Sequence, residues 1–317
     1  MSLPREVLPN RYYMITRRCT QRHYLLRPGT KINQAFEYCL GYAAEKHKID
    51  IVLTCAMSNH HHTVIYDRLG TYPQFLEYFH MLLARCLNAL RDRKENFWSS
   101  DPPCMVRLVG MRDILDKLAY VACNPVTANL VETVEEWPGV NRYQALISQQ
   151  PVTVERPKFF FRQDDKSKMP KSVTIRYAFP PEAGEAQLYL AALRKRVTER
   201  VRELREERRR EGRRVVGAEA VRRLSWRDKP KTKRKKTDIR PTFAARDTWD
   251  RQEAVTRNKE FLRAYKEARA AFLAGEDAAF PLGTYWLRRF VGVPIKQPDA
   301  DPAEPSPPST RVPQSRD

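Results

Sequence analysis

The chain has 317 residues, enough for about two domains that each bury a core of ordinary size. Its 58 lysines and arginines outweigh 38 aspartates and glutamates, and the net charge of +20 points to a polyanionic partner, most often nucleic acid. No run of about 18 apolar residues occurs, and no apolar segment lies close to the first residue, so we expect neither a membrane span nor a secretory signal. The six cysteines form no Cys-x-x-Cys pair, which favours free thiols in a reducing cytoplasm over a zinc knuckle.

The first predicted strand covers residues 11–19, where apolar and polar side chains alternate. A basic stretch overlaps its end, and these arginines are either phosphate contacts or solvated loop charges. The candidate DNA contacts are Arg17, Arg18, Arg22 and Arg27. Thr30 is expected to cap the helix that follows, whose apolar residues recur at helical spacing as far as Ala43.

Two strands, over residues 50–56 and 60–67, are predicted to form a hairpin closed by a tight turn. The second strand begins with three of the chain's six histidines. Because strand side chains alternate, His60 and His62 share one face and His61 points to the other. Two neutral imidazoles on one face of a rigid strand can bind a divalent metal; the alternative is a polar loop that happens to be rich in histidine.

A long helix is predicted over residues 72–91 and a further strand over residues 104–109. His80 on this helix is interpreted as a satisfied or exposed side chain rather than a metal ligand. Trp98, in the loop that follows, either packs in the core or stacks on a base. The order strand, helix, strand, strand, helix, strand, helix is the split βαβ pattern of a ferredoxin-like α+β fold.

The last helix of this unit begins near Asp113, a candidate cap, and is expected to stop at Pro125. Tyr120 and Asn124 are four residues apart and therefore lie on the same face of this helix. A tyrosine hydroxyl close to a metal-bound phosphate can act as a nucleophile.

Two motifs carry a resemblance to a known family. Asn-His-x-His before an apolar run, at residues 59–62, and Tyr-x-x-x-Asn-Pro-Val-x-Ala-x-Leu-Val, at residues 120–131, resemble motifs of the REP-associated tyrosine transposases. These belong to the single-tyrosine HUH transposases of the insertion-sequence 200/605 class. The resemblance covers roughly residues 10–146. Two positions depart from it, since His61 replaces a hydrophobic residue and Asn141-Arg142 replaces a serine pair.

The resemblance implies an HUH endonuclease domain over residues 1–146 that cleaves and rejoins single-stranded or hairpin DNA through a 5′-phosphotyrosine bond. Tyr120 would be the nucleophile. His60 and His62 would hold Mg²⁺ or Mn²⁺, and Asn124 would offer a third polar ligand. A homodimer is implied because two strand cleavages need two tyrosines. We accordingly expect a cytoplasmic, nucleoid-associated transposase.

Two other interpretations stay open. A non-catalytic, domesticated DNA-hairpin-binding protein would bind hairpins without forming a covalent bond to DNA. A different metal-dependent enzyme, such as a hydrolase that uses the histidines, would keep its activity after Tyr120→Phe.

The remainder is predicted as a connector over residues 147–183, a basic, mostly helical accessory DNA-binding region over residues 184–296 and a disordered tail over residues 297–317. Residues 151–317 carry 40 basic and 24 acidic side chains, against 18 and 14 in residues 1–150. The attraction to DNA is therefore expected mainly from this half.

Three features of the accessory region are predicted. Apolar residues of a helix over residues 184–214 form a seam that either pairs with a partner helix or packs on its own chain. A basic run provides the candidate DNA contacts Lys233, Arg234, Lys235 and Lys236. A second helix, over residues 250–274, is expected to end at Gly275.

Overall fold

The computed structural model describes residues 4–164, 168–232 and 241–296. The strands are β1 (Arg11–Arg18), β2 (Ile49–Met57), β3 (His60–Asp67), β4 (Cys104–Leu108), β5 (Val152–Glu155), β6 (Ser172–Ile175) and β7 (Phe243–Ala244). The helices are α1 (Thr30–His47), α2 (Tyr72–Leu90), α3 (Met111–Thr127), α4 (Tyr143–Ser148), α5 (Ala186–Arg210), α6 (Ala218–Arg223), α7 (Thr248–Leu273) and α8 (Trp286–Val291), with short 3-10 helices η1 (Thr20–Arg22) and η2 (Pro181–Ala183). The predicted α+β class is confirmed, while the expected tail at residues 297–317 lies outside the described residues.

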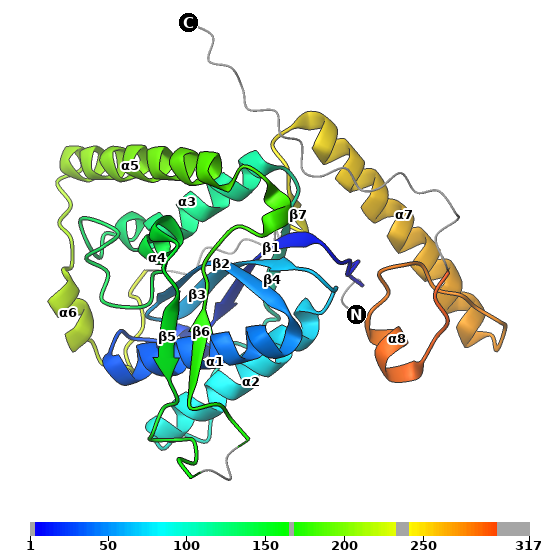
Figure 1. Cartoon of the computed structure of the whole chain (residues 1–317), viewed down its shortest axis with the longest axis horizontal. Coiled ribbons are helices and arrows are strands. Elements are labelled where there is room, and N and C mark those ends of the chain that lie inside the picture. The colour runs from blue at the N-terminus through cyan, green and yellow to red at the C-terminus, as the bar shows by residue number, and fades with distance from the viewer. Residues whose placement is uncertain (1–3, 165–167, 233–240, 297–317) are drawn as a thin grey trace, which may run out of the picture.

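A five-stranded sheet in the order β2-β3-β1-β4-β7 forms the centre of the molecule. Its first four strands pair antiparallel, and the two-residue strand β7 adds to β4 in parallel. Helices α1 and α2 pack together on one face of the sheet, and α3 covers the other (Figure 1). Because β3 lies between β2 and β1 and pairs with both over its length, the histidine strand is held rigidly on either side.

Segments from the second half of the chain complete this core. The seam of α5 is buried against α3 and joins the main hydrophobic cluster, so it packs on its own chain (Figure 1). Its buried members are Leu190, Leu193, Val197 and Leu204. The β5–β6 hairpin lies over α1, where a Cβ on Gly41 would come within 2.8 Å of Ile175 Cγ1. Only glycine at position 41 allows this close approach.

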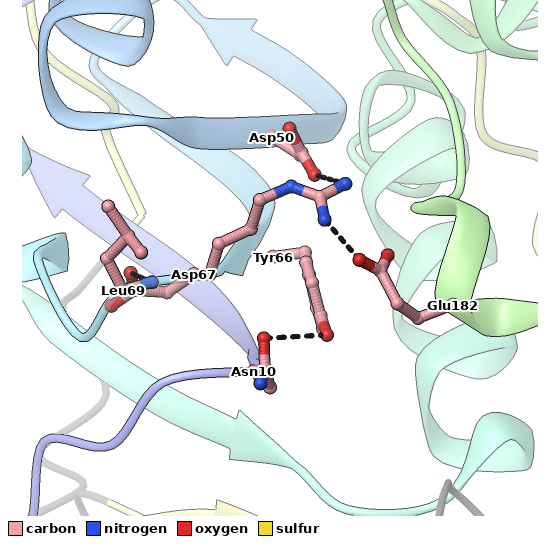
Figure 2. A network of polar contacts seen from close by, with 7 residues as sticks. Asn10, Asp50, Tyr66, Asp67, Leu69 and Glu182 are labelled. Carbon is pink, nitrogen blue, oxygen red and sulfur yellow. Dashed lines mark hydrogen bonds and ion pairs between the residues drawn. The ribbon is translucent and has the colours of Figure 1, made fainter.

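The end of β3 away from the histidines is fixed by polar contacts (Figure 2). Arg68 pairs with Asp50 at 2.7 Å and also with Glu182, which links the β2–β3 hairpin to η2. Asp67 accepts hydrogen bonds from the backbone N–H groups of Thr71 and Tyr72, both at 2.9 Å, and so fixes the start of α2. These contacts help to set the register in which β3 presents its histidines.

Three local predictions about helix ends are wrong. Helix α3 continues through Pro125 to Thr127, because a proline in the last turn removes only one hydrogen bond while the N–H of Ala128 still donates to Asn124 at 3.0 Å. Thr30 is the first residue of α1, after Gly29, and its side chain does not cap the helix. Asp113 lies in the first turn of α3 rather than at the N-cap position, which Gly110 occupies, and it accepts the N–H of Arg246 at 2.9 Å.

The C-terminal helices α7 and α8 form a small satellite of the core (Figure 1). Phe280 is fully buried there, and Arg257 pairs with Glu6 of the N-terminal segment at 3.0 Å. Helix α7 ends at Leu273, two residues before Gly275, whose positive φ of 79° fits the predicted stop. None of the described helices is long and apolar enough to cross a membrane.

Candidate active site

The pleat of β3 separates the three consecutive histidines. His60 and His62 share the face covered by α3, and their ring centroids are 4.8 Å apart. His61 points to the opposite face, where it is fully buried between aromatic rings of α1 and α2. The alternation expected of a strand therefore pairs the two outer histidines and removes the middle one from their surroundings.

Each outer histidine uses one ring nitrogen within the protein and leaves the other available. Nδ1 of His60 lies 2.7 Å from Oδ1 of Asn59, and since an amide oxygen only accepts, Nδ1 donates and Nε2 carries a lone pair. Nδ1 of His62 lies 2.8 Å from Oγ1 of Thr16, its cross-strand partner on β1. Nε2 of His62 is buried and has no hydrogen-bond partner among the described residues. A buried imidazole nitrogen without a partner fits a metal ligand.

Burial keeps both histidines neutral. Burial, with the positive charge of Arg18, lowers the pKa of His60 to about 4. Burial and the neighbouring imidazoles lower the pKa of His62 well below its usual value. A metal binds only the neutral imidazole, so this pair is in its ligand form at neutral pH.

Tyr120 on α3 faces the histidine pair, on the side of the sheet that α3 covers. Its ring centroid lies 5.3 Å from that of His62, in an edge-on arrangement, and the residue is 44% exposed. Burial raises the pKa of the Tyr120 hydroxyl, while a hydrogen bond with Asn124 and the charge of Arg18 act in the opposite direction. Asn124 and Arg18 therefore favour the phenolate, while burial, the larger effect, disfavours it.

Asn124 is placed by the helical repeat, one turn beyond Tyr120, and is 8% exposed. Its side chain contacts the tyrosine hydroxyl in this structure. In the part of the chain that the structure describes, no group of three or more His, Cys, Asp or Glu side chains could hold a metal. A metal at this site would therefore rely on His60, His62 and oxygen ligands of other kinds.

The four candidate DNA-contacting arginines have different positions. Arg18 is exposed and lies opposite His60 in the β1–β3 register, beside the site. Arg17 donates to loop carbonyls, including that of Ser99 at 3.0 Å. The others reach segments of the C-terminal half: Arg22 donates to Thr232 and Arg27 to the carbonyl of Leu224. The candidates Lys233, Arg234, Lys235 and Lys236 lie outside the described residues.

The opposite face of β3 holds a closed polar network. Nε2 of His61 lies 3.0 Å from Nε2 of His80, and Nδ1 of His61 lies 3.0 Å from Oγ1 of Thr63. Trp98 is buried and donates through Nε1 to the backbone carbonyl of His80 at 2.9 Å. The interpretation of His80 as a satisfied side chain is confirmed, and Trp98 packs in the core.

Sequence reasoning did not identify Thr16 and Asn59 as residues that orient the histidines. Thr16 lies 46 residues from His62, and only the pairing of β1 with β3 brings the two together. Asn59 is adjacent to His60, and its position in the turn between β2 and β3 was a signal that could have been used.

No protein-family model matches the chain, and no curated protein matches it. Among solved structures, it is similar to a REP-associated tyrosine transposase bound to a REP hairpin, with 14% identity and a TM-score of 0.40 over 52% of this chain and 92% of the other. It is also similar to a putative transposase from Deinococcus radiodurans, with 16% identity and a TM-score of 0.27 over 33% of this chain and 85% of the other. Likenesses at this level carry no information on the chemistry of the site.

Proposed function

We propose that the protein is a metal-dependent tyrosine HUH transposase that cleaves and rejoins single-stranded DNA. The proposal rests on one observation. Two neutral histidines of β3 face an exposed tyrosine of α3, and the ring centroid of His62, whose buried Nε2 has no partner among the described residues, lies 5.3 Å from that of Tyr120. The order β2-β3-β1-β4 is compatible with a ferredoxin-like split βαβ domain over residues 1–146. The connector at residues 147–183 and the accessory region at residues 184–296 complete the proposed organisation.

The proposed reaction exchanges one phosphodiester for another. The Tyr120 oxygen loses its proton to solvent and attacks the phosphorus of the scissile phosphate. The bond from phosphorus to the 3′ oxygen breaks, and that oxygen takes up a proton to become a free 3′-OH. A 5′-phosphotyrosine bond remains, and the 3′-OH of another strand can reverse the step without ATP, because each step replaces one phosphodiester with another.

Residues of this chain would prepare the reacting groups. His60 and His62, with the amide oxygen of Asn124, would hold Mg²⁺ or Mn²⁺, which when bound supplies charge stabilisation at the phosphate. A tyrosine has an ordinary pKa of about 10, so the phenolate needs assistance near neutral pH. The hydrogen bond from Asn124 and the charge of Arg18 provide part of it. Arg18 would also attract the phosphate.

The partner and assembly follow from this chemistry. Among the described residues one tyrosine faces the histidine pair, so two cleavages would require two copies, and we propose a homodimer. Single-stranded or hairpin DNA, carried in a cytoplasmic nucleoid, is the proposed substrate. The excess of basic side chains in residues 151–317 supports a polyanionic partner.

The test is a denaturing gel of purified protein with labelled hairpin DNAs and Mn²⁺. We expect a covalent band with the wild type, its loss with Tyr120→Phe, and its retention with Tyr42→Phe, which removes a hydroxyl on the opposite side of the sheet. A band that survives Tyr120→Phe would assign the activity to another nucleophile. No wild-type band, with hairpin binding retained, would favour the non-catalytic DNA-binding protein, which the lack of a third His, Cys, Asp or Glu ligand among the described residues also supports.

A further inference from the structure

A cleft of about 580 Å³ opens beside Tyr120, between α3 and the segment that contains β7 and the start of α7. Tyr120 and Lys117 lie on the α3 side, together with two aspartates. Residues 241–246 and Arg251 form the opposite wall. The proposed nucleophile therefore lies at the edge of a cavity whose second wall comes from the C-terminal half.

The two aspartates of the cleft hold its walls together. Asp113 accepts the backbone N–H of Arg246 at 2.9 Å. Asp116 pairs with Nη1 of Arg246 at 3.0 Å and with Nε of Arg196 at 3.2 Å. Their negative charge is thus compensated by arginines. Together with the pairing of β7 to β4, these contacts fix the C-terminal wall against α3.

Two other cations of the cleft have no such partner. Nζ of Lys117 lies 6.0 Å from the centroid of the Tyr120 ring. Arg251 is exposed in the first turn of α7. Neither side chain forms an ion pair with a carboxylate of the described residues, in contrast to Arg246. Two cations that have no ion-pair partner among the described residues and line the same cavity as Tyr120 fit a ligand with several negative charges along its length.

Apart from Thr242, the remaining lining of the cleft is apolar. Pro241, Phe243, Ala244 and Val255 all contribute to it. A chain of phosphates with sugars and bases between them, as in single-stranded DNA, matches this alternation of cations with apolar surface. A cavity of this size accepts a ligand of drug-like dimensions, roughly one or two nucleotides.

We propose that this cleft holds the stretch of single-stranded DNA next to the scissile phosphate, and that Lys117 and Arg251 contact its backbone phosphates. The inference rests on the proposed function of Tyr120. It assigns β7 and the start of α7 to substrate positioning, so the C-terminal half contributes a wall of the site as well as general positive charge.

The experiment measures binding of a fluorescent single-stranded oligothymidylate at several salt concentrations, with all variants carrying Tyr120→Phe so that no covalent bond forms. Each phosphate contact to single-stranded DNA contributes about 0.7 to the slope of log K against log salt. We expect Lys117→Gln and Arg251→Gln each to reduce the slope by about 0.7 and the double variant by about twice that. Arg263→Gln, also exposed on α7 but outside the cleft lining, should leave the slope unchanged.

The same substitutions with Tyr120 intact separate this inference from the proposed function. We expect the rate of covalent adduct formation to fall at limiting DNA and to return to the wild-type rate at saturating DNA, because the substitutions remove binding contacts only. Slopes equal to that of the Arg263→Gln control, with adduct formed, would overturn the cleft inference alone. Reduced slopes with no wild-type adduct would support DNA binding in the cleft and overturn the reaction. Thermal melting curves of each variant are the control for folding.

Discussion

The two faces of β3 place the same residue type in opposite situations. On the α1–α2 face, both ring nitrogens of His61 have partners, Thr63 and His80, each at 3.0 Å. On the α3 face, His62 is nearly as deeply buried, yet its Nε2 has no partner among the described residues. Burial alone therefore does not distinguish a structural histidine from a candidate ligand. His61 and His62 differ instead in the number of ring nitrogens that have a partner among the described residues.

The largest expected difference between the faces is in activity. We expect His60→Gln and His62→Gln each to lower the rate of adduct formation by more than about 100-fold, because replacing even residues behind a metal ligand typically costs 10–100-fold. His61→Gln is the matched control on the opposite face, and its folded fraction should react within a few-fold of the wild type. The measurement is the initial rate of adduct formation with Mn²⁺.

Mn²⁺ titration calorimetry provides an independent check of this contrast. Binding should be lost in the His60→Gln and His62→Gln variants and kept in His61→Gln. Equal losses of metal binding for all three would show that the two faces do not differ in their effect on the metal. Unchanged Mn²⁺ binding in His60→Gln and His62→Gln would remove the metal site from β3.

The second expected effect is in stability, and here the larger loss is expected on the α1–α2 face. His61→Ala should lower the free energy of unfolding by about 3 kcal/mol, because it leaves a cavity and a buried His80 nitrogen without its partner. Urea unfolding at pH 7 measures this. His60→Ala, at the partly exposed start of β3, should cost clearly less. A larger loss for His60→Ala would mean that the α3 face contributes more to stability than the buried network of His61 and His80.

Local periodicity predicted much of this arrangement. The alternation of a strand was enough to separate His61 from its two neighbours, and the four-residue spacing was enough to place Asn124 beside Tyr120. Both rules concern residues close together in sequence, where backbone geometry leaves little choice. The strands and helices of the first 130 residues were found for the same reason, since their apolar patterns are long.

Contacts between distant segments could not be obtained in this way. The approach of α3 to β3 at His62, the pairing of Thr16 with His62 and the meeting of His80 with His61 depend on how the elements pack. Strand β7 was missed altogether, because two residues show no periodicity and their parallel pairing with β4 joins segments more than 130 residues apart. The cleft beside Tyr120 was consequently invisible before the fold was known.

The third expected effect is a pH dependence of stability, to which the buried His80 on the α1–α2 face of β3 contributes. Burial lowers the pKa of His80 to about 3, whereas the unfolded chain binds this proton near pH 6.5. Between these values the unfolded state holds more protons, so stability falls as the pH falls. From pH 7 to pH 5, His80 should account for a loss of about 2 kcal/mol.

Replacing His80 by glutamine tests this assignment. Glutamine can still hydrogen-bond His61 but does not titrate, so the difference in urea stability between pH 7 and pH 5 should shrink by about 2 kcal/mol in His80→Gln. The control is His23→Gln, which removes a histidine whose Nδ1 lies 2.6 Å from the carbonyl of Arg227, away from this network. An unchanged pH difference in His80→Gln would place the acid sensitivity elsewhere.

The smallest expected effect concerns the α3 face of β3, where the Asn124 side chain hydrogen-bonds the Tyr120 hydroxyl. The hydrogen bond from Asn124 favours the phenolate, so Asn124→Ala should raise the pKa of Tyr120 further. The rate of adduct formation should fall by about 10-fold near neutral pH, and its rise with pH should move to more alkaline values.

Asn124→Asp separates two roles of this side chain. If Asn124 chiefly holds the metal, the carboxylate should retain Mn²⁺ binding and most of the rate. If it chiefly donates to the phenolate, the acceptor-only carboxylate should be as slow as alanine, because it removes the donor and adds a negative charge beside the developing anion.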